Sequence, residues 1–173
     1  GHTSEDVQVK LDLSEPLPRS KIDPEQFRQV LINLIQNAIQ AMDGAGKVTV
    51  STSHRRLTRG AWAAASAERA SRADDATEVV EVSVRDTGPG ITQTVLRNLF
   101  IPFFTTKAKG TGLGLAISQS IVQSAGGTIH VQTQSGAGTT FTIVLPAAVE
   151  DGLIAGGAVV KSEAEGVPAR EGV

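Results

Sequence analysis

The chain has 173 residues, of which 40% are hydrophobic, and a formal net charge of −2, which suits one globular domain with loose ends. The near-neutral charge argues against nucleic acid or an anionic membrane as a partner, and no stretch reaches the ~20 apolar residues that span a bilayer. The absence of cysteine excludes disulfides and thiolate metal sites and fits a protein of the cytoplasm.

The first predicted elements are a strand and a long helix. Apolar and polar residues alternate over residues 7–13, which predicts a half-buried strand. Asp23 is a suitable N-cap and Pro24 suits the first helical position, so a helix should begin here. Apolar residues then recur at helical spacing until Asp43 and Gly44, and this face should pack on a sheet.

Two further strands are predicted over residues 48–53 and 79–85, where apolar and polar residues again alternate. The segment between them, residues 54–78, is rich in alanine and charged residues and shows neither a strand period nor a clear buried stripe. We predict that it is an insertion loop, in part helical, that protrudes from one edge of the sheet, outside any ligand pocket.

The second half of the chain also alternates helices and strands. A short helix is predicted over residues 92–100, and a longer one over 113–125 should stop at Gly126 and Gly127. Residues 128–133 and 139–145 should then form a hairpin. Because residues 148–173 show no period, we predict one domain over residues 1–147 and a flexible C-terminal tail over 148–173.

Three carboxamide residues, Asn33, Asn37 and Gln40, fall in one stripe beside the apolar face of the first helix. Asparagine is a poor helix former, because its side chain competes for nearby backbone groups. The stripe is therefore either surface filler or a ligand set. A carboxamide oxygen is a hard, neutral ligand that suits Mg²⁺, which takes few protein ligands and keeps its waters and phosphate oxygens.

An acid stands in a glycine turn: Asp86 ends a predicted strand and opens the sequence DTGPGI. Gly88 and Gly90 allow a tight turn and a close approach to a flat ligand. The acid could then accept a hydrogen bond from an exocyclic amine of that ligand. Many such triplets are simple turns, and the same letters mark aspartic proteases, which need two carboxylates. No second triplet occurs, and the long helical runs argue against a small all-β protease.

Gly110, Gly112 and Gly114 alternate just before the second long helix. A glycine-rich loop that leads into a helix N-terminus offers backbone amides and the positive end of a dipole to phosphate. A flexible linker would look similar, but here the helix follows directly. Neither the Walker pattern nor the eukaryotic-type kinase motifs occur in the sequence.

Four stretches, in the right order, resemble the N, G1, F and G2 boxes of bacterial sensor histidine kinases: NLIQNA (33–38), DTGPGI (86–91), FIPFFTTK (100–107) and GTGLGL (110–115). The resemblance covers roughly residues 5–147, and LFIPFFTTKAKGTGLGLAIS is especially similar to the nitrogen-regulatory branch. It implies the Bergerat fold, an α/β sandwich in which about three helices cover one face of a mixed, mostly antiparallel sheet.

The resemblance also implies an ATP and Mg²⁺ site. Asp86 would hold the adenine amino group, Asn37 would coordinate Mg²⁺, and Asn33 would support the γ-phosphate end. Lys107 would bring positive charge from the lid and act with Asn33 in catalysis. The full implied nucleotide-binding set is Asn33, Asn37, Asp86, Gly88, Gly90, Ile91, Phe104, Thr106, Lys107, Gly110, Thr111, Gly112, Leu113, Gly114, Leu115 and Thr140.

Two departures from the family pattern bear on function. Gln40 stands where many members place a basic residue, so charge neutralisation should rest more on Lys107 or Lys109. The second departure is that none of the histidines is followed by the acid that normally marks the phosphoacceptor.

The resemblance also implies that Phe103 and Phe104 anchor the lid, although plain core packing is the alternative for each ring.

The chain is therefore expected to be a kinase catalytic half without its substrate domain. It would bind Mg-ATP and transfer the γ-phosphate to a histidine of its dimerisation and phosphoacceptor domain, absent from this chain, and a response regulator receiver domain would follow. The alternative is a nucleotide-binding switch or an ATPase of the same superfold. Such ATPases resemble one another in carrying a glutamate one turn before the metal-binding asparagine, and Asn33 at that position disfavours hydrolysis.

Overall fold

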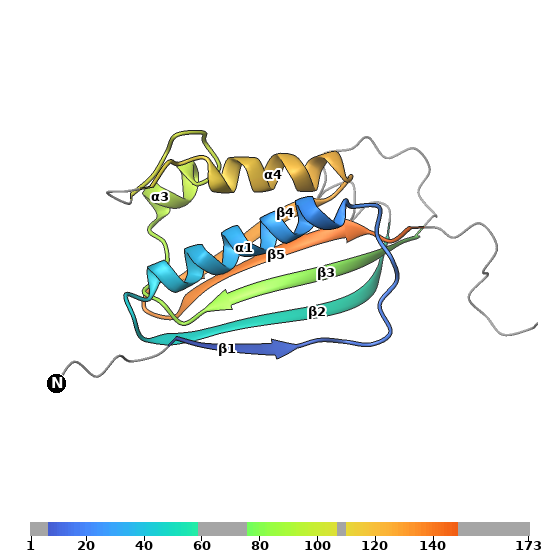
Figure 1. Cartoon of the computed structure of the whole chain (residues 1–173), viewed down its shortest axis with the longest axis horizontal. Helices are drawn as coiled ribbons and strands as arrows, with labels where there is room; N and C mark the ends of the chain where they lie inside the picture. Colours follow the sequence, from blue (N-terminus) through green and yellow to red (C-terminus); the bar gives the residue numbers. More distant parts are fainter. Residues whose placement is uncertain (1–6, 59–75, 107–109, 149–173) are drawn as a thin grey trace, which may run out of the picture.

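The computed structural model describes residues 7–58, 76–106 and 110–148, which form one five-stranded sheet with helices on one face (Figure 1). The strands are β1 (Val7–Asp12), β2 (Gly46–Thr58), β3 (Ala76–Asp86), β4 (Thr128–Gln134) and β5 (Gly138–Pro146). The helices are α1 (Pro24–Ala41), α3 (Gln93–Asn98) and α4 (Gly114–Ser124).

The sheet is mixed, with the strand order β1-β2-β3-β5-β4. β1 runs parallel to β2, whereas the other neighbouring pairs are antiparallel. α1 and α4 lie side by side on the same face of the sheet, as Figure 1 shows. In the part of the chain that the structure describes, this confirms the predicted sandwich of a mostly antiparallel sheet and three helices. No helix there is long and apolar enough to cross a membrane.

The core lies between the helices and the central strands. Val30 and Leu34 of α1 are fully buried, and they join one cluster with Val48, Val84 and Ile143 from β2, β3 and β5. These positions share the helical or strand period of the sequence, so the apolar face of α1 packs on the sheet as predicted.

Both long helices have the ends that the sequence predicts. The side chain of Asp23 accepts a hydrogen bond from the Gln26 N–H at 2.9 Å, which caps α1. Behind α4, Gly126 has a left-handed φ of 75°, and the Gly127 N–H donates to the Val122 carbonyl at 2.9 Å. This bond satisfies one of the carbonyls that a helix end leaves open.

The hairpin of β2 and β3 is longer than predicted. Thr58 pairs with Ala76, so the ends of the segment predicted as a loop, residues 54–58 and 76–78, belong to strands. Residues 59–75, the middle of that segment, lie outside the described residues.

Charged pairs explain why this extension escaped prediction. The Arg55 guanidinium donates to the Glu81 carboxylate at 2.8 Å, and His54 contacts Glu78 on the same pair of strands. Cross-strand pairs of opposite charge stabilise a sheet, yet they interrupt the alternation of apolar and polar residues that marks a strand in sequence.

The first strand is less buried than predicted. Although Val7 packs against the core, 53% of Val9 and 62% of Leu11 are exposed. β1 is an edge strand, and Figure 1 shows it at the border of the sheet, away from α4. Val9 and Leu11 pair with the buried Val48 and Val50 of β2. The alternation in the sequence therefore correctly predicted the face on which these residues lie, but it did not predict that this part of the face is exposed.

Candidate nucleotide-binding site

Asp86 lies at the end of β3 with only 3% of its surface exposed. Its Oδ1 atom accepts hydrogen bonds from the backbone N–H groups of Gly88, at 2.8 Å, and Thr139, at 3.2 Å. A buried carboxyl group needs such partners, because burying an unpaired polar group is costly. The carboxyl group is therefore held in one position by main-chain donors from two separate segments of the chain.

The glycine turn after Asp86 leaves little room for a side chain at Gly88 or Gly90. A Cβ atom on Gly88 would lie 3.0 Å from Oδ1 of Asp86. Gly90 has a φ of 82°, and a Cβ atom there would collide with the carbonyl of Gln134. The turn passes into Ile91, whose N–H donates to the Thr133 hydroxyl at 2.8 Å. The glycines thus bring the turn against both the acid and the β4–β5 hairpin.

A cavity of about 420 Å³ opens beside Asp86, within the range of sites for small molecules. It lies between α1, the glycine turn, α3 and the start of β5. Its lining combines one acid with mainly apolar side chains and consists of Asn37, Ala38, Gln40, Ala41, Asp86, Gly90, Ile91, Thr92, Val95, Leu99, Thr106, Leu115, Thr139 and Phe141.

Thr139, rather than the predicted Thr140, lines this cavity. Successive side chains of a strand point to opposite faces, and Thr139 shares the helix-covered face with the buried Phe141. Thr140 therefore falls on the opposite face of the sheet. The alternation within β5 separates the two threonines, because Thr139 lies two residues before the buried Phe141 and Thr140 only one.

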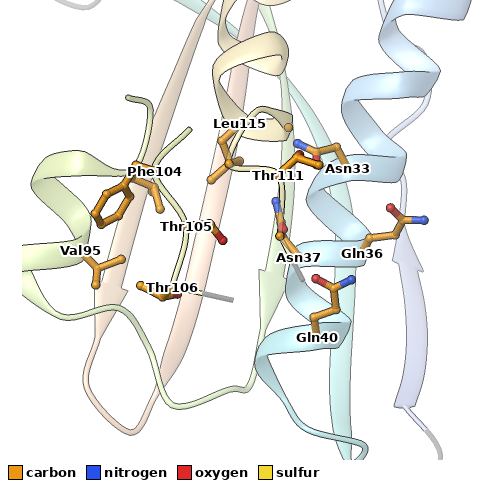
Figure 2. Close-up of a pocket in the computed structure, with 14 residues that line it drawn as sticks. Asn33, Gln36, Asn37, Gln40, Val95, Phe104, Thr105, Thr106, Thr111 and Leu115 are labelled. Atoms are coloured by element: carbon orange, nitrogen blue, oxygen red, sulfur yellow. The ribbon is translucent and has the colours of Figure 1, made fainter. Parts of the chain in front are cut away.

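A second cavity of about 220 Å³ adjoins the first, since the two share six lining residues. Figure 2 shows Asn33 and Asn37 on α1 facing Thr105 and Thr111 across it, whereas the side chain of Gln36 points away. The full lining is Asn33, Gln36, Asn37, Gln40, Val95, Leu99, Phe104, Thr105, Thr106, Gly110, Thr111, Gly112, Gly114 and Leu115.

The carboxamide stripe of α1 thus borders a cavity and is not plain surface filler. Asn37 and Gln40 line both parts, and Asn33 lines only the part near the glycine-rich loop. Asn33 donates from Nδ2 to the Ser118 hydroxyl of α4 at 2.9 Å. This bond joins the two long helices beside the cavity.

The F box is held by its backbone and not by both rings. The Phe103 side chain is 76% exposed, and its N–H donates to the carbonyl of Gly112 at 2.9 Å. Phe104 is half-buried and lines the smaller cavity. The prediction that both rings anchor the lid is therefore wrong for Phe103, while Lys107 and Lys109 lie outside the described residues.

Most of the other predicted residues gather at this pair of cavities, with two exceptions. Gly88 lies beside Asp86 and Leu113 is the N-cap residue of α4, and neither lines a cavity. Several residues that the fold places at or beside the site were not predicted from the sequence. Ser118 carried a usable signal, because it is a polar residue one turn before the buried Val122 on the apolar face of α4. The other cavity-lining residues that were not predicted are Gln36, Ala38, Ala41, Thr92, Val95, Leu99, Thr105, Thr139 and Phe141.

Comparison with known families shows the family to which a chain with this fold and site belongs. Residues 22–149 match the family model described as "Histidine kinase-, DNA gyrase B-, and HSP90-like ATPase". The chain belongs to this ATPase family. The match spans α1, the glycine turn, the F box and the glycine-rich loop, which are the segments that enclose the two cavities.

Curated relatives within the ATPase family are sensor histidine kinases. The chain is 41% identical over 143 residues to the sensor histidine kinase ZraS of Escherichia coli (strain K12) and 40% identical over 148 residues to the sensor kinase CckA of Brucella abortus (strain 2308). These alignments cover 83% and 84% of the chain but only 26% and 15% of the relatives. The chain thus spans about a quarter or less of their length.

Solved structures agree with this assignment to the ATPase family. The catalytic domain of histidine kinase ThkA, in a nucleotide-free form, has a TM-score of 0.61 at 32% identity, covering 82% of this chain and 80% of that one. Full-length ShkA in complex with AMPPNP has a TM-score of 0.62 at 28% identity, covering 83% of this chain and 26% of that one. The predicted Bergerat fold is confirmed, and the nitrogen-regulatory branch stays a prediction.

Proposed function

We propose that this chain binds Mg-ATP and transfers the γ-phosphate to a histidine of a dimerisation and phosphoacceptor domain outside it. That histidine would then pass the phosphate to the receiver domain of a response regulator. The observation that carries the proposal is that four separate motifs enclose two adjoining cavities, of which Asp86 lines one and Asn33 the other. The names of the relatives support kinase activity, and the family supports ATP binding.

Adenine would occupy the end of the cavity near Asp86. Oδ1 of this residue already accepts two backbone N–H groups, so the exocyclic amine of adenine would donate to Oδ2. The mainly apolar lining, with Ile91 and Phe141, suits the faces of a flat ring.

The phosphates would occupy the other end, against the glycine-rich loop. Gly110, Gly112 and Gly114 line this part, and no side chain caps the N-terminus of α4. Its first N–H groups and the positive end of the helix dipole are suited to phosphate oxygens. Lys107 would add positive charge from the loop.

The residues present fit Mg²⁺. Asn37 lies where the two parts of the cavity meet, and the described residues contain no cluster of three or more His, Cys, Asp or Glu. Mg²⁺ needs few protein ligands, so Asn37 would hold it together with phosphate oxygens and waters. When bound, the ion would neutralise phosphate charge and align the oxygens of the transfer.

The transfer needs positioning more than acid–base chemistry from this chain. An imidazole nitrogen of the acceptor histidine forms a bond to the γ-phosphorus, while the bond from that phosphorus to the β–γ bridging oxygen breaks. ADP leaves with the electron pair, and the imidazole N–H proton passes to solvent. Asn33 cannot take a proton from water at neutral pH, which supports transfer over hydrolysis and disfavours the ATPase alternative.

The domain would act in the cytoplasm. We propose that it ends near residue 148, because the N–H of Ala148 donates to the Arg19 carbonyl at 2.7 Å and the family match ends at 149. This is one residue beyond the predicted boundary at 147. The predicted tail from residue 149 onward lies outside the described residues.

The test is transfer of radiolabel from γ-labelled ATP to the dimerisation and phosphoacceptor domain of the same parent protein, added in trans. The expected product is an acid-labile, base-stable label on that domain, and Asn37→Ala should abolish it. Gln29→Ala, an exposed change on the same helix, should leave it unchanged. Rapid release of free phosphate without labelled acceptor would favour the ATPase alternative. ATP binding with neither product would favour a nucleotide-binding switch.

A further inference from the structure

Ser118 places a hydroxyl group in the buried face of α4. Only 1% of its surface is exposed, and it lies one helical turn before Val122, which is fully buried. A buried hydroxyl destabilises a protein unless it has a hydrogen-bond partner. The partner here is Nδ2 of Asn33 on α1, at 2.9 Å.

The other side of the Asn33 carboxamide also lies against α4. A Cβ atom on Gly114, the first residue of α4, would collide with Oδ1 of Asn33. Glycine is a poor helix former, so its presence at this position is explained by the space that Asn33 takes. Helix α4 thus bonds the nitrogen of this carboxamide and leaves room for its oxygen.

This carboxamide stands at the phosphate part of the cavity. Asn33 and Gly114 line that part and not the part beside Asp86. Ser118 lines neither, so it has no access to a nucleotide and acts only through Asn33. Nδ2 carries two hydrogens, and a bond from one of them to Ser118 fixes the direction of the other.

We propose that Ser118 is a positioning residue for the γ-phosphate. Its hydroxyl holds the carboxamide plane of Asn33 in one orientation, and it keeps that group in register with the N-terminus of α4. This inference rests on the proposed function, because it takes the phosphates of ATP to occupy this part of the cavity. It predicts that loss of the hydroxyl weakens the binding of a nucleoside triphosphate more than that of a diphosphate.

The experiment compares Ser118→Ala with wild type by calorimetry, using a non-hydrolysable ATP analogue and ADP, each with Mg²⁺. The Kd for the analogue should rise about fivefold, the effect of one hydrogen bond, and that for ADP should change less than about twofold. Ser120→Ala, an exposed change on the same helix, should alter neither value. In an Asn33→Ala background, Ser118→Ala should have no further effect on the analogue.

Three results would overturn the inference. An equal loss of affinity for both nucleotides would mean that Ser118 only supports the fold of the domain. Unchanged affinity for the analogue would mean that Asn33 is positioned without it. An additional loss in the Asn33→Ala background would mean that Ser118 acts by another route. Wild-type protein that binds neither nucleotide would instead overturn the proposed function itself.

Discussion

The backbone N–H of Thr139 lies 3.2 Å from Oδ1 of Asp86 and donates to it, although 53 residues separate the two in the chain. Gly88 donates to the same oxygen from the other side. Both hydrogen bonds end on the same oxygen, so the main chain sets the orientation of the carboxyl group at the edge of the cavity.

Asp86→Asn should weaken ATP binding by roughly 1.5–3 kcal/mol, the range for losing a hydrogen bond to a charged group. An amide nitrogen in place of Oδ2 would face the amino group of adenine donor to donor. Calorimetry on the whole chain measures the change, with Asp43→Asn in the exposed turn after α1 as the matched control. Wild-type protein with no preference for ATP over GTP would contradict the assignment of Asp86.

The two neighbouring threonines of β5 should behave differently. Thr139→Val removes a buried hydroxyl that lies 3.1 Å from the Thr133 hydroxyl, which in turn accepts the N–H of Ile91. We expect about a fivefold loss of ATP affinity, equivalent to one hydrogen bond. Thr140→Val, on the opposite face, should change the Kd less than about twofold. A larger effect at Thr140 would show that the register of β5 is misplaced.

Gly90→Ala should destabilise the protein more than Gly136→Ala. Both glycines have positive φ, at 82° and 75°, so alanine pays a similar conformational cost of about 1–2 kcal/mol at each. Only at Gly90 does the new Cβ also collide, with the carbonyl of Gln134, whereas Gly136 faces open space. The difference in unfolding free energy, measured with urea, should be about 1–3 kcal/mol. Equal values would mean that the turn relaxes away from the hairpin.

Replacing residues 59–75 by Asn-Gly should preserve both folding and nucleotide binding. Thr58 and Ala76 are directly paired, and Asn-Gly is the preferred two-residue turn for such a hairpin. We expect the unfolding free energy to stay within about 1 kcal/mol and the Kd for ATP within about twofold. A tenfold loss of affinity in a folded variant would place part of the segment at the cavity.

Local signals in the sequence were enough for much of this architecture. The cap at Asp23 and the stop at Gly126 depend only on residues within a turn or two, and both are as predicted. The acid in the glycine turn was also recognisable, because a strand end followed by Gly88 and Gly90 requires little knowledge of the rest of the chain.

Features that depend on distant partners could not be predicted in this way. The length of the β2–β3 hairpin rests on cross-strand pairs such as Arg55 with Glu81. The contact between Thr139 and Asp86 rests on the pairing of β5 with β3, and the role of Ser118 rests on the packing of α4 against α1. In each case, the deciding neighbour lies at least 26 residues away in the chain.

The backbone contact between Phe103 and Gly112 has a consequence for the evolution of the domain. Phe103 has a left-handed φ of 66°, its N–H is bonded to Gly112, and a Cβ atom on Gly112 would collide with the Phe103 backbone. The backbones of Phe103 and Gly112, at the two ends of the stretch, are thus held together by main-chain contacts that do not depend on the side chains between them. Insertions and deletions between these residues can alter the reach and charge of the loop while the entry to α4 stays where it is.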